Sequence, residues 1–288
     1  MAASRQTRFS LPKTLAGVRA VLLAPGALFM AAGFVLPLLV TLWISLQPSE
    51  GVPLDAYWKT ARSSLFWRVV WNTFEISLLS ALLATVFGYV IALHMSRQSP
   101  TRRRVLTVVI LTPFWTSILV KSYAFIVVLG REGLLNKAIQ AVFPGADPVD
   151  LLFNRTGLAI GMTHQIVPFA VLPILASLLA VDGNLARAAR VMGASEMTIF
   201  SRIILPLSMP GVLAAFLLVF TIGLGAYITP ALLGGERDIM IANLIDLRLR
   251  DTLDWPGASV IALMLAAAVA ALIVLSRYLA AKMQKGFA

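Results

Sequence analysis

The segment that decides the fold is residues 69–95, which read VVWNTFEISLLSALLATVFGYVIALHM. Glu75 is the only Asp, Glu, Lys or Arg in this stretch, and apolar side chains occupy most of the other positions. The apolar core of a bilayer is crossed by a helix of about 20 such residues. Because backbone N–H and C=O groups in lipid must bond within their own segment, the stretch predicts a transmembrane α-helix.

Similar charge-poor stretches recur along the 288-residue chain. The six predicted spans are residues 20–46, 69–95, 105–130, 156–181, 211–233 and 257–279. A soluble domain usually carries about a quarter charged residues, whereas this chain is 59% hydrophobic and 13% charged, with a mean hydropathy of +0.87. The composition excludes a soluble globular protein and predicts an all-α polytopic membrane protein with six transmembrane helices.

The domain organisation is expected to be simple. No internal repeat and no Gly-, Ser- or Pro-rich linker divides the chain, so we predict a single transmembrane domain over residues 20–288. A basic tail, residues 1–19, precedes it. The apolar run after this tail is longer than the apolar region of a signal peptide, and no small-residue cleavage site follows it. We therefore expect it to remain as a membrane anchor. The chain contains no cysteine, which excludes disulfides, thiolate metal sites and cysteine nucleophiles.

The orientation follows from where the basic residues lie. Short loops rich in Lys and Arg are retained in the cytoplasm. The two tails and the loops at 96–104 and 182–210, counted with Arg277 at the end of the last span, hold 14 Lys and Arg but two acids. The three alternate loops hold nine Lys and Arg and ten acids. We therefore expect both termini in the cytoplasm, and a multi-pass protein of the bacterial inner membrane.

The loop at 182–210, between the fourth and fifth predicted spans, carries the sharpest motif in the chain. Asp182 or Asn184 can cap a first short helix, and Gly193 suits the left-handed residue that ends it. Small alanines on this helix would let it approach a partner closely. The loop is therefore a candidate docking element, the alternative being an amphipathic loop that lies in the membrane interface.

A second helix is expected after Gly193. Met197, Phe200 and Ile204 recur at helical spacing and form one apolar face. Pro206 is expected to stop this helix, because proline lacks the N–H of a helix interior.

The spacing across both helices resembles the EAA loop of bacterial ABC importer permeases. Seven positions match that pattern in order over nineteen residues: Ala188, Ala189, Gly193, Phe200, Ile203, Leu205 and Pro206. The resemblance implies that the first helix fits a groove on an ATPase subunit and moves with it. The chain itself has no G-x-x-x-x-G-K-[ST] pattern, so ATP and Mg²⁺ would bind to a partner chain, and no cofactor is expected on this one.

The ATPase-coupling residues implied by this resemblance are Arg187, Ala188, Ala189, Met192, Gly193, Phe200 and Pro206. Arg187 departs from the family pattern, because the family has a glutamate there. Any contact that the carboxylate makes in relatives must be absent or reversed in charge in this chain.

Two other regions resemble spermidine/putrescine-type permeases. They are PFWTSILVKSY at 113–123 with LGREGLLN at 129–136, and TPALLGG at 229–235 with MIANLI at 240–245. The resemblance implies import of polyamines or a related small amine, although related permeases carry opines and other amino-acid derivatives. A secondary transporter that works without ATP is a less favoured alternative.

The candidate solute-path residues are Glu75, Trp115, Tyr123, Gln165 and Tyr227. An ammonium group in a low-dielectric path needs carboxylates or aromatic faces, which suggests the aromatic members. Each aromatic could instead pack against lipid or a neighbouring helix. Gln165 follows His164 near the middle of the membrane, where transporters hold their solute.

Glu75 and Lys121 are the two charged residues in the interior of the predicted spans, since Arg277 lies near the end of the last one. Counting along the spans places both in the outer half of the membrane, so they could form an ion pair that fixes helix register. The alternative is that Glu75 faces the path and receives an ammonium group.

Catalysis and metal binding are not expected. His94 and His164 have no second His or carboxylate at i+3 or i+4 to complete a metal site. The sequence lacks H-E-x-x-H, G-x-S-x-G and a pair of intramembrane aspartates, so an intramembrane enzyme is disfavoured.

The expected partners are two ATPase subunits, a second similar permease subunit, an extracytoplasmic solute-binding protein and membrane lipid. Nucleic acid is not expected, because the net charge of +11 is spread between apolar blocks.

Overall fold

The computed structural model describes residues 13–47 and 54–285, and every regular element among them is a helix. In chain order these are α1 (Lys13–Ser45), α2 (Asp55–Arg62), α3 (Ser64–Ser96), α4 (Pro100–Trp115), α5 (Ile118–Leu129), α6 (Leu134–Val142), α7 (Arg155–Ala180), α8 (Gly183–Val191), α9 (Glu196–Ile199), the π-helical turn η1 (Phe200–Ile204), α10 (Leu205–Leu224), α11 (Ile228–Leu233), α12 (Ile241–Arg250) and α13 (Trp255–Lys285). Residues 1–12 of the predicted tail lie outside the described residues.

The described helices supply five candidate membrane spans, and a bent pair of helices can supply a sixth. Five stretches are long and apolar enough to cross a membrane: Leu23–Ser45, Ser64–Ser96, Arg155–Ala180, Glu196–Leu224 and Trp255–Val274. The helices Pro100–Trp115 and Ile118–Val142 pass the same test together, with a bend of 94° between them. If this bent pair is one span, the described residues give six. The prediction of an all-α polytopic membrane protein is confirmed.

The third predicted span, residues 105–130, is interrupted rather than continuous. α4 ends at Trp115, Thr116 is extended with φ −91° and ψ 132°, and α5 begins two residues later. Pro113 lies in the last turn of α4, where it removes one backbone donor and weakens the helix. The interruption therefore has a local cause, and it leaves polar backbone inside the apolar region.

The fifth predicted span, residues 211–233, is displaced. The spanning helix runs over Glu196–Leu224, and Gly225 ends it before α11 begins. The expectation that Pro206 stops the helix is wrong, because Pro206 lies in the first turn of α10. The π-helical turn η1 precedes it, with the N–H of Leu205 donating to the carbonyl of Phe200. This wider turn lets the helix continue past a residue that has no N–H to donate.

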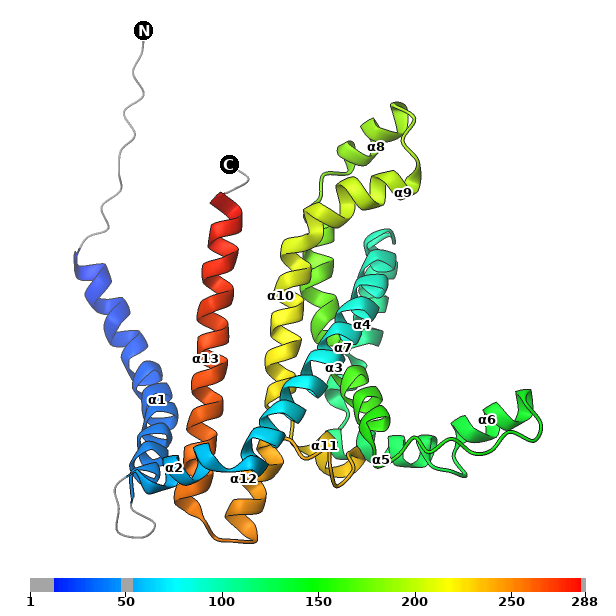
Figure 1. The fold of residues 1–288 in the computed structure, drawn as a ribbon. Helices are drawn as coiled ribbons and strands as arrows, with labels where there is room; N and C mark the ends of the chain where they lie inside the picture. The colour runs from blue at the N-terminus through cyan, green and yellow to red at the C-terminus, as the bar shows by residue number, and fades with distance from the viewer. Residues whose placement is uncertain (1–12, 48–53, 286–288) are drawn as a thin grey trace.

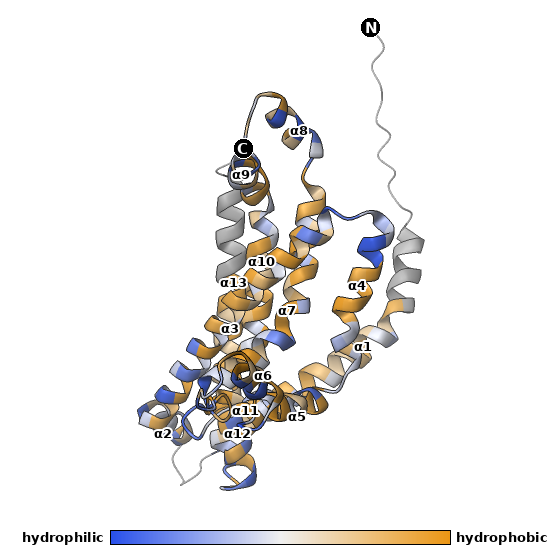
Figure 2. Ribbon diagram, turned by 90° about the vertical axis from the view of Figure 1, so that its right-hand side faces the viewer, coloured by the Kyte–Doolittle hydropathy of each residue, from blue (hydrophilic) through white to orange (hydrophobic). Residues whose placement is uncertain are grey.

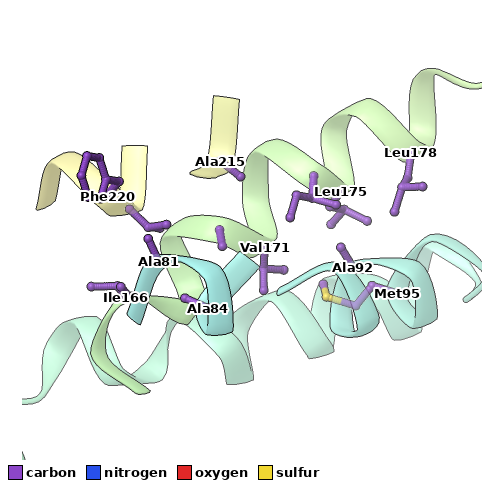
Figure 3. Close-up of a cluster of buried hydrophobic side chains, with 13 residues drawn as sticks. Ala81, Ala84, Ala92, Met95, Ile166, Val171, Leu175, Leu178, Ala215 and Phe220 are labelled. Carbon is purple, nitrogen blue, oxygen red and sulfur yellow. The ribbon is translucent and has the colours of Figure 1, made fainter. Parts of the chain in front are cut away.

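The core lies where α3, α7 and α10 pack together, as Figure 3 shows. Alanines recur among its larger apolar side chains, and Ala81, Ala84, Ala170 and Ala215 are fully buried. At Gly88 on α3 an added Cβ would lie 2.8 Å from the Cβ of Ala170 on α7. Small residues let helix backbones approach closely in lipid, where hydrophobic burial between helices supplies little.

Hydropathy is arranged in bands along the molecule. In Figure 2 apolar residues colour the middle of α3, α4, α7 and α10, whereas polar residues gather on α8 at one end and on α2 and α12 at the other. None of the apolar window of α1 is buried, and α1 packs against α13. An apolar band with polar ends is the surface expected of a membrane-spanning protein.

The two ends of the molecule carry different elements (Figure 1). α8 and α9 project at the same end as the first turn of α1 and the last turn of α13. α2, α5, α6, α11 and α12 gather at the opposite end. The arrangement separates a projecting loop from a broad assembly of short helices.

Candidate functional site

The projecting loop has the predicted geometry. Asp182 caps α8, its side chain accepting from the N–H of Asn184 at 2.9 Å. Gly193 has φ +82°, the left-handed conformation that glycine adopts at little cost. The helix–glycine–helix arrangement expected from the sequence is confirmed.

The tip of this loop presents apolar side chains to its surroundings. Val191 is 89% exposed and Met192 is 80% exposed, and Ala188 is also exposed. Ala189, expected to face a partner, is buried within the loop at 5% exposure. Arg187 is exposed and donates to Asn184 Oδ1 at 2.7 Å, so its charge lies on the loop surface. The exposed small and apolar side chains at the tip of the loop are therefore those of Ala188, Val191 and Met192.

An ion pair spans the turn at Gly193. Arg190 on α8 donates two hydrogen bonds to Glu196 on α9, from Nε at 2.5 Å and from Nη2 at 3.2 Å. Such a two-bond fork fixes direction as well as distance. The pair therefore links α8 to α9 across the turn, with both side chains more than half exposed.

The loop is joined to the core through Phe200, an expected coupling residue. Its ring packs edge to face against Tyr89 on α3, with ring centres 6.1 Å apart. The Tyr89 hydroxyl lies 3.1 Å from Ser208 Oγ on α10. Ser177 on α7 donates to the Ser208 carbonyl at 3.3 Å. These contacts connect the loop to all three core helices.

The first of two hollows lies beside the break between α10 and α11. It has a volume of about 270 Å³ and includes the unwound backbone at Gly225 and Ala226. Gln165 and Tyr227, both expected solute-path residues, line it. Thr229 Oγ1 donates to Gln165 Oε1 at 2.8 Å, which orients the amide.

The second hollow lies beside the break between α4 and α5. Its volume is about 440 Å³, and Gln165 and Ile118 line it as well as the first. The other residues that line it are Pro113, Phe114, Thr116, Ser117, Lys121, Pro168 and Phe169. Two interrupted helices therefore meet at Gln165 on α7. Interrupted helices are where transporters place solute sites, because unwound backbone offers polar groups at membrane depth.

The remaining expected path residues lie elsewhere. Trp115 and Tyr123 are 76% and 59% exposed and line neither hollow. Glu75 does not line them either. Of the five expected path residues, the structure brings only Gln165 and Tyr227 together.

The expected pairing of Glu75 with Lys121 is wrong. Arg155, the first residue of α7, bonds Glu75 Oε2 from Nη1 at 2.8 Å, Asp238 Oδ1 from Nε at 2.9 Å and Asn72 Oδ1 from Nη2 at 2.8 Å. Lys121 instead donates to the carbonyl of Pro113 at 3.0 Å. Arg155 lies one position before the predicted span 156–181 and so belongs to a loop in the sequence prediction, which does not anticipate this network. Its position at a span boundary was the available signal.

A hydrogen bond to α12 fixes the position of the Tyr227 hydroxyl. Its hydroxyl donates to Asp246 Oδ2 at 2.8 Å, and Arg250 donates to Asp246 Oδ1 at 2.6 Å. The hydrogen bonds from Arg250 and then from Tyr227 lower the pKa of Asp246, while the bond to this carboxylate raises the pKa of the Tyr227 hydroxyl. Tyr227 therefore stays a neutral donor at physiological pH.

Metal ligands do not gather in the described part of the chain, where no three His, Asp or Glu side chains could hold an ion together. His164 packs edge to face on Phe125, with ring centres 5.2 Å apart.

A helical membrane protein with a projecting helix–glycine–helix loop, and with hollows at interrupted helices, has the features of a transport permease. Residues 84–285 match the family described as the binding-protein-dependent transport system inner membrane component. The chain belongs to this family, and it is a multi-pass inner-membrane permease of an ABC importer.

The curated relatives show which permeases within this family are similar to the chain in sequence. The spermidine/putrescine transport system permease protein PotB of Haemophilus influenzae is 31% identical over 244 residues, 83% of this chain and 85% of the relative. PotB of Salmonella typhimurium is 32% identical over 192 residues, 67% of each chain. The predicted resemblance to spermidine/putrescine-type permeases is confirmed.

The fold is also that of a solved transporter. In the crystal structure of a bacterial alginate ABC transporter in complex with alginate pentasaccharide-bound periplasmic protein, one chain matches with a TM-score of 0.81. The match covers 94% of this chain and 96% of that chain at 17% identity. At this identity the likeness concerns the fold alone.

Proposed function

We propose that this permease imports polyamines such as spermidine and putrescine, or a related small amine, and that it carries out no chemistry of its own. The similarity to PotB over most of the chain carries this proposal. A solute of the opine or amino-acid-derivative class is the alternative, because hydrogen-bonding groups such as Gln165 and Tyr227 would also suit it.

The loop at α8 and α9 couples transport to ATP held with Mg²⁺ by two partner ATPase subunits. Its exposed apolar tip at Val191 and Met192 supports this role, because large exposed apolar side chains beyond a membrane segment mark docking surfaces. The loop therefore lies in the cytoplasm, as do both termini at the same end of the molecule.

Movement of the loop would reach the solute path through the core. The Arg190–Glu196 fork turns α9 with α8, and Phe200 and Ser208 transfer that motion to α3 and α7. Since α7 carries Gln165, a shift of α7 changes both hollows at once. This is a mechanical route for alternating access, with a second permease subunit completing the path and a solute-binding protein delivering the solute from outside.

Uptake by the reconstituted importer tests the proposal. The permease, its partner permease, the ATPase subunits and the solute-binding protein are placed in liposomes, and ATP-dependent uptake of labelled putrescine and spermidine is measured. We expect saturable uptake that unlabelled octopine does not inhibit. Uptake of neither amine would overturn the solute class, and transport by this chain alone without ATP would overturn the coupling.

A further inference from the structure

Lys121 supplies the only charged side chain among the residues that line the two hollows in the described part of the chain. It is half-buried on α5, and its ammonium group donates to the carbonyl of Pro113 at 3.0 Å. The bond crosses the break, since Pro113 lies in the last turn of α4. A fixed positive charge beside the path would repel a cationic solute. This conflict is removed if the Lys121 ammonium group and the solute occupy the same site at different times.

The surroundings of the Lys121 ammonium group are those of a cation site. The last carbonyls of a helix lie at the negative end of its dipole, and α4 ends at Trp115. The Pro113 carbonyl accepts from the N–H of Thr116 at 3.3 Å, and its second lone pair is left for an ammonium group. Phe114 and Phe169, whose ring centres are 4.6 Å apart, line the same hollow and can offer aromatic faces to an ammonium group. Thr116 and Gln165 add neutral oxygens.

We infer that the hollow at the α4–α5 break binds a primary alkylammonium group, and that Lys121 occupies this site as a tethered competitor until solute displaces it. A lysine side chain is a four-carbon stem that ends in a primary ammonium, the same chemistry as one end of putrescine. The inference rests on the proposed amine solute and adds the site that receives one of its ends.

The geometry separates this role from two others. If Lys121 bound an acidic solute, its ammonium group would be expected to point into the hollow rather than to bond a backbone carbonyl. If Lys121 only braced the bend, its removal would loosen the break without making the site more available to an amine. The three roles predict different changes in the affinity for amines.

The first experiment measures equilibrium binding of labelled putrescine to the permease–ATPase complex in nanodiscs, without the solute-binding protein. Lys121→Met should lower the dissociation constant by about threefold to tenfold, because the competent fraction of sites rises when the internal competitor is removed. Lys137→Met, at an exposed position on α6 outside both hollows, is the control for loss of one positive charge and should change little. An unchanged or higher dissociation constant for Lys121→Met would overturn the inference.

The second experiment does not depend on the identity of the solute. In Lys121→Ala the vacated space and the adjoining hollow should accept free n-butylamine, which should raise the thermal unfolding midpoint of the complex. n-Butyltrimethylammonium has no N–H to donate to the Pro113 carbonyl and should raise the midpoint less. Wild-type complex should respond to neither probe at the same concentration. Equal responses to both probes, or a response to neither in the variant, would overturn the site. If the wild-type importer takes up neither polyamine but the variant binds n-butylamine, the proposed solute fails while the alkylammonium site stands.

Discussion

Arg155 Nη1 lies 2.8 Å from Glu75 Oε2, and this contact ties the first turn of α7 to α3. The same guanidinium reaches Asp238, whose side chain is 8% exposed. A basic residue is unfavourable at a helix N-terminus, where the dipole is positive, so the carboxylates must outweigh that cost. Arg155 therefore fixes three segments at the end of the molecule opposite α8.

Replacing Arg155 should destabilise the protein more than replacing Glu75. Arg155→Met leaves the nearly buried Asp238 carboxylate without this partner and should lower the free energy of unfolding by about 2–3 kcal/mol. Glu75→Gln loses one half-exposed contact and should cost about 1 kcal/mol or less. Arg155→Lys keeps the positive charge but cannot make the three separate hydrogen bonds of the guanidinium, so its loss of unfolding free energy should lie between those of the other two variants. Unfolding in detergent measures all three, and equal losses for Arg155→Met and Glu75→Gln would contradict the network.

Glu75 and Lys121 show which features of the site can be predicted from the sequence and which cannot. The sequence identifies both as charges inside apolar spans, but their hydrogen-bond and ion-pair partners depend on where the helices break and begin. Lys121 bonds across a bend, and Arg155 begins a helix one residue before the predicted boundary. Apolar length identifies spans well because the bilayer sets their size, whereas helix ends depend on packing that a single sequence does not reveal.

The coupling loop was more predictable because its determinants are local. Asp182 and Gly193 act through their own backbone neighbourhood, so the cap and the left-handed turn could be foreseen. The prediction that Pro206 stops the helix is wrong, because the π-helical turn before it lets the helix continue. The burial of Ala189 also depends on tertiary packing, which spacing alone could not indicate.

Gly193 should tolerate only residues that adopt a positive φ. Gly193→Val places a β-branched side chain at φ +82° and should cost the loop about 1–2 kcal/mol or more, changing the angle between α8 and α9. Gly193→Asn should retain most activity, because asparagine visits this region readily. Solute-stimulated ATPase activity of the assembled importer is the readout. If the two variants had comparable ATPase activity, the angle between α8 and α9 at Gly193 would not matter for coupling.

A glutamate should have different effects at Met192 and at Ala189, because the first side chain is exposed and the second is buried. Met192→Glu puts a charge on the exposed tip and should abolish ATPase stimulation while leaving the permease's unfolding midpoint unchanged. Ala189→Glu places a carboxylate in a buried position and should lower that midpoint as well. Co-purification with the ATPase subunits separates the two effects. If Met192→Glu still binds the ATPase and stimulates it normally, the docking face lies elsewhere.

The Tyr227–Asp246 contact should be insensitive to pH near neutrality. Because Arg250 and Tyr227 lower the pKa of Asp246 below its ordinary value, the contact is fully present above that value and is lost only as pH falls through the lowered pKa. Asp246→Asn should therefore reduce uptake by the same factor at pH 6 and pH 8. Uptake that converges with wild type at either pH would show that another group controls this region.

Gln165 is the polar side chain that both hollows share, so its loss should affect transport more than the loss of Thr229, which orients it. Gln165→Leu removes the hydrogen-bonding group at the junction of the two interrupted helices and should lower the uptake rate about tenfold or more. Thr229→Val keeps the shape but leaves the Gln165 carbonyl without this 2.8 Å bond, which should cost about 1 kcal/mol of stability and lower uptake about threefold to tenfold. In the double variant the Thr229 change should have no additional effect, since the group it orients is gone. Additive losses in rate would mean that Thr229 acts on the path by itself, and an unaffected rate in Gln165→Leu would place the solute outside both hollows.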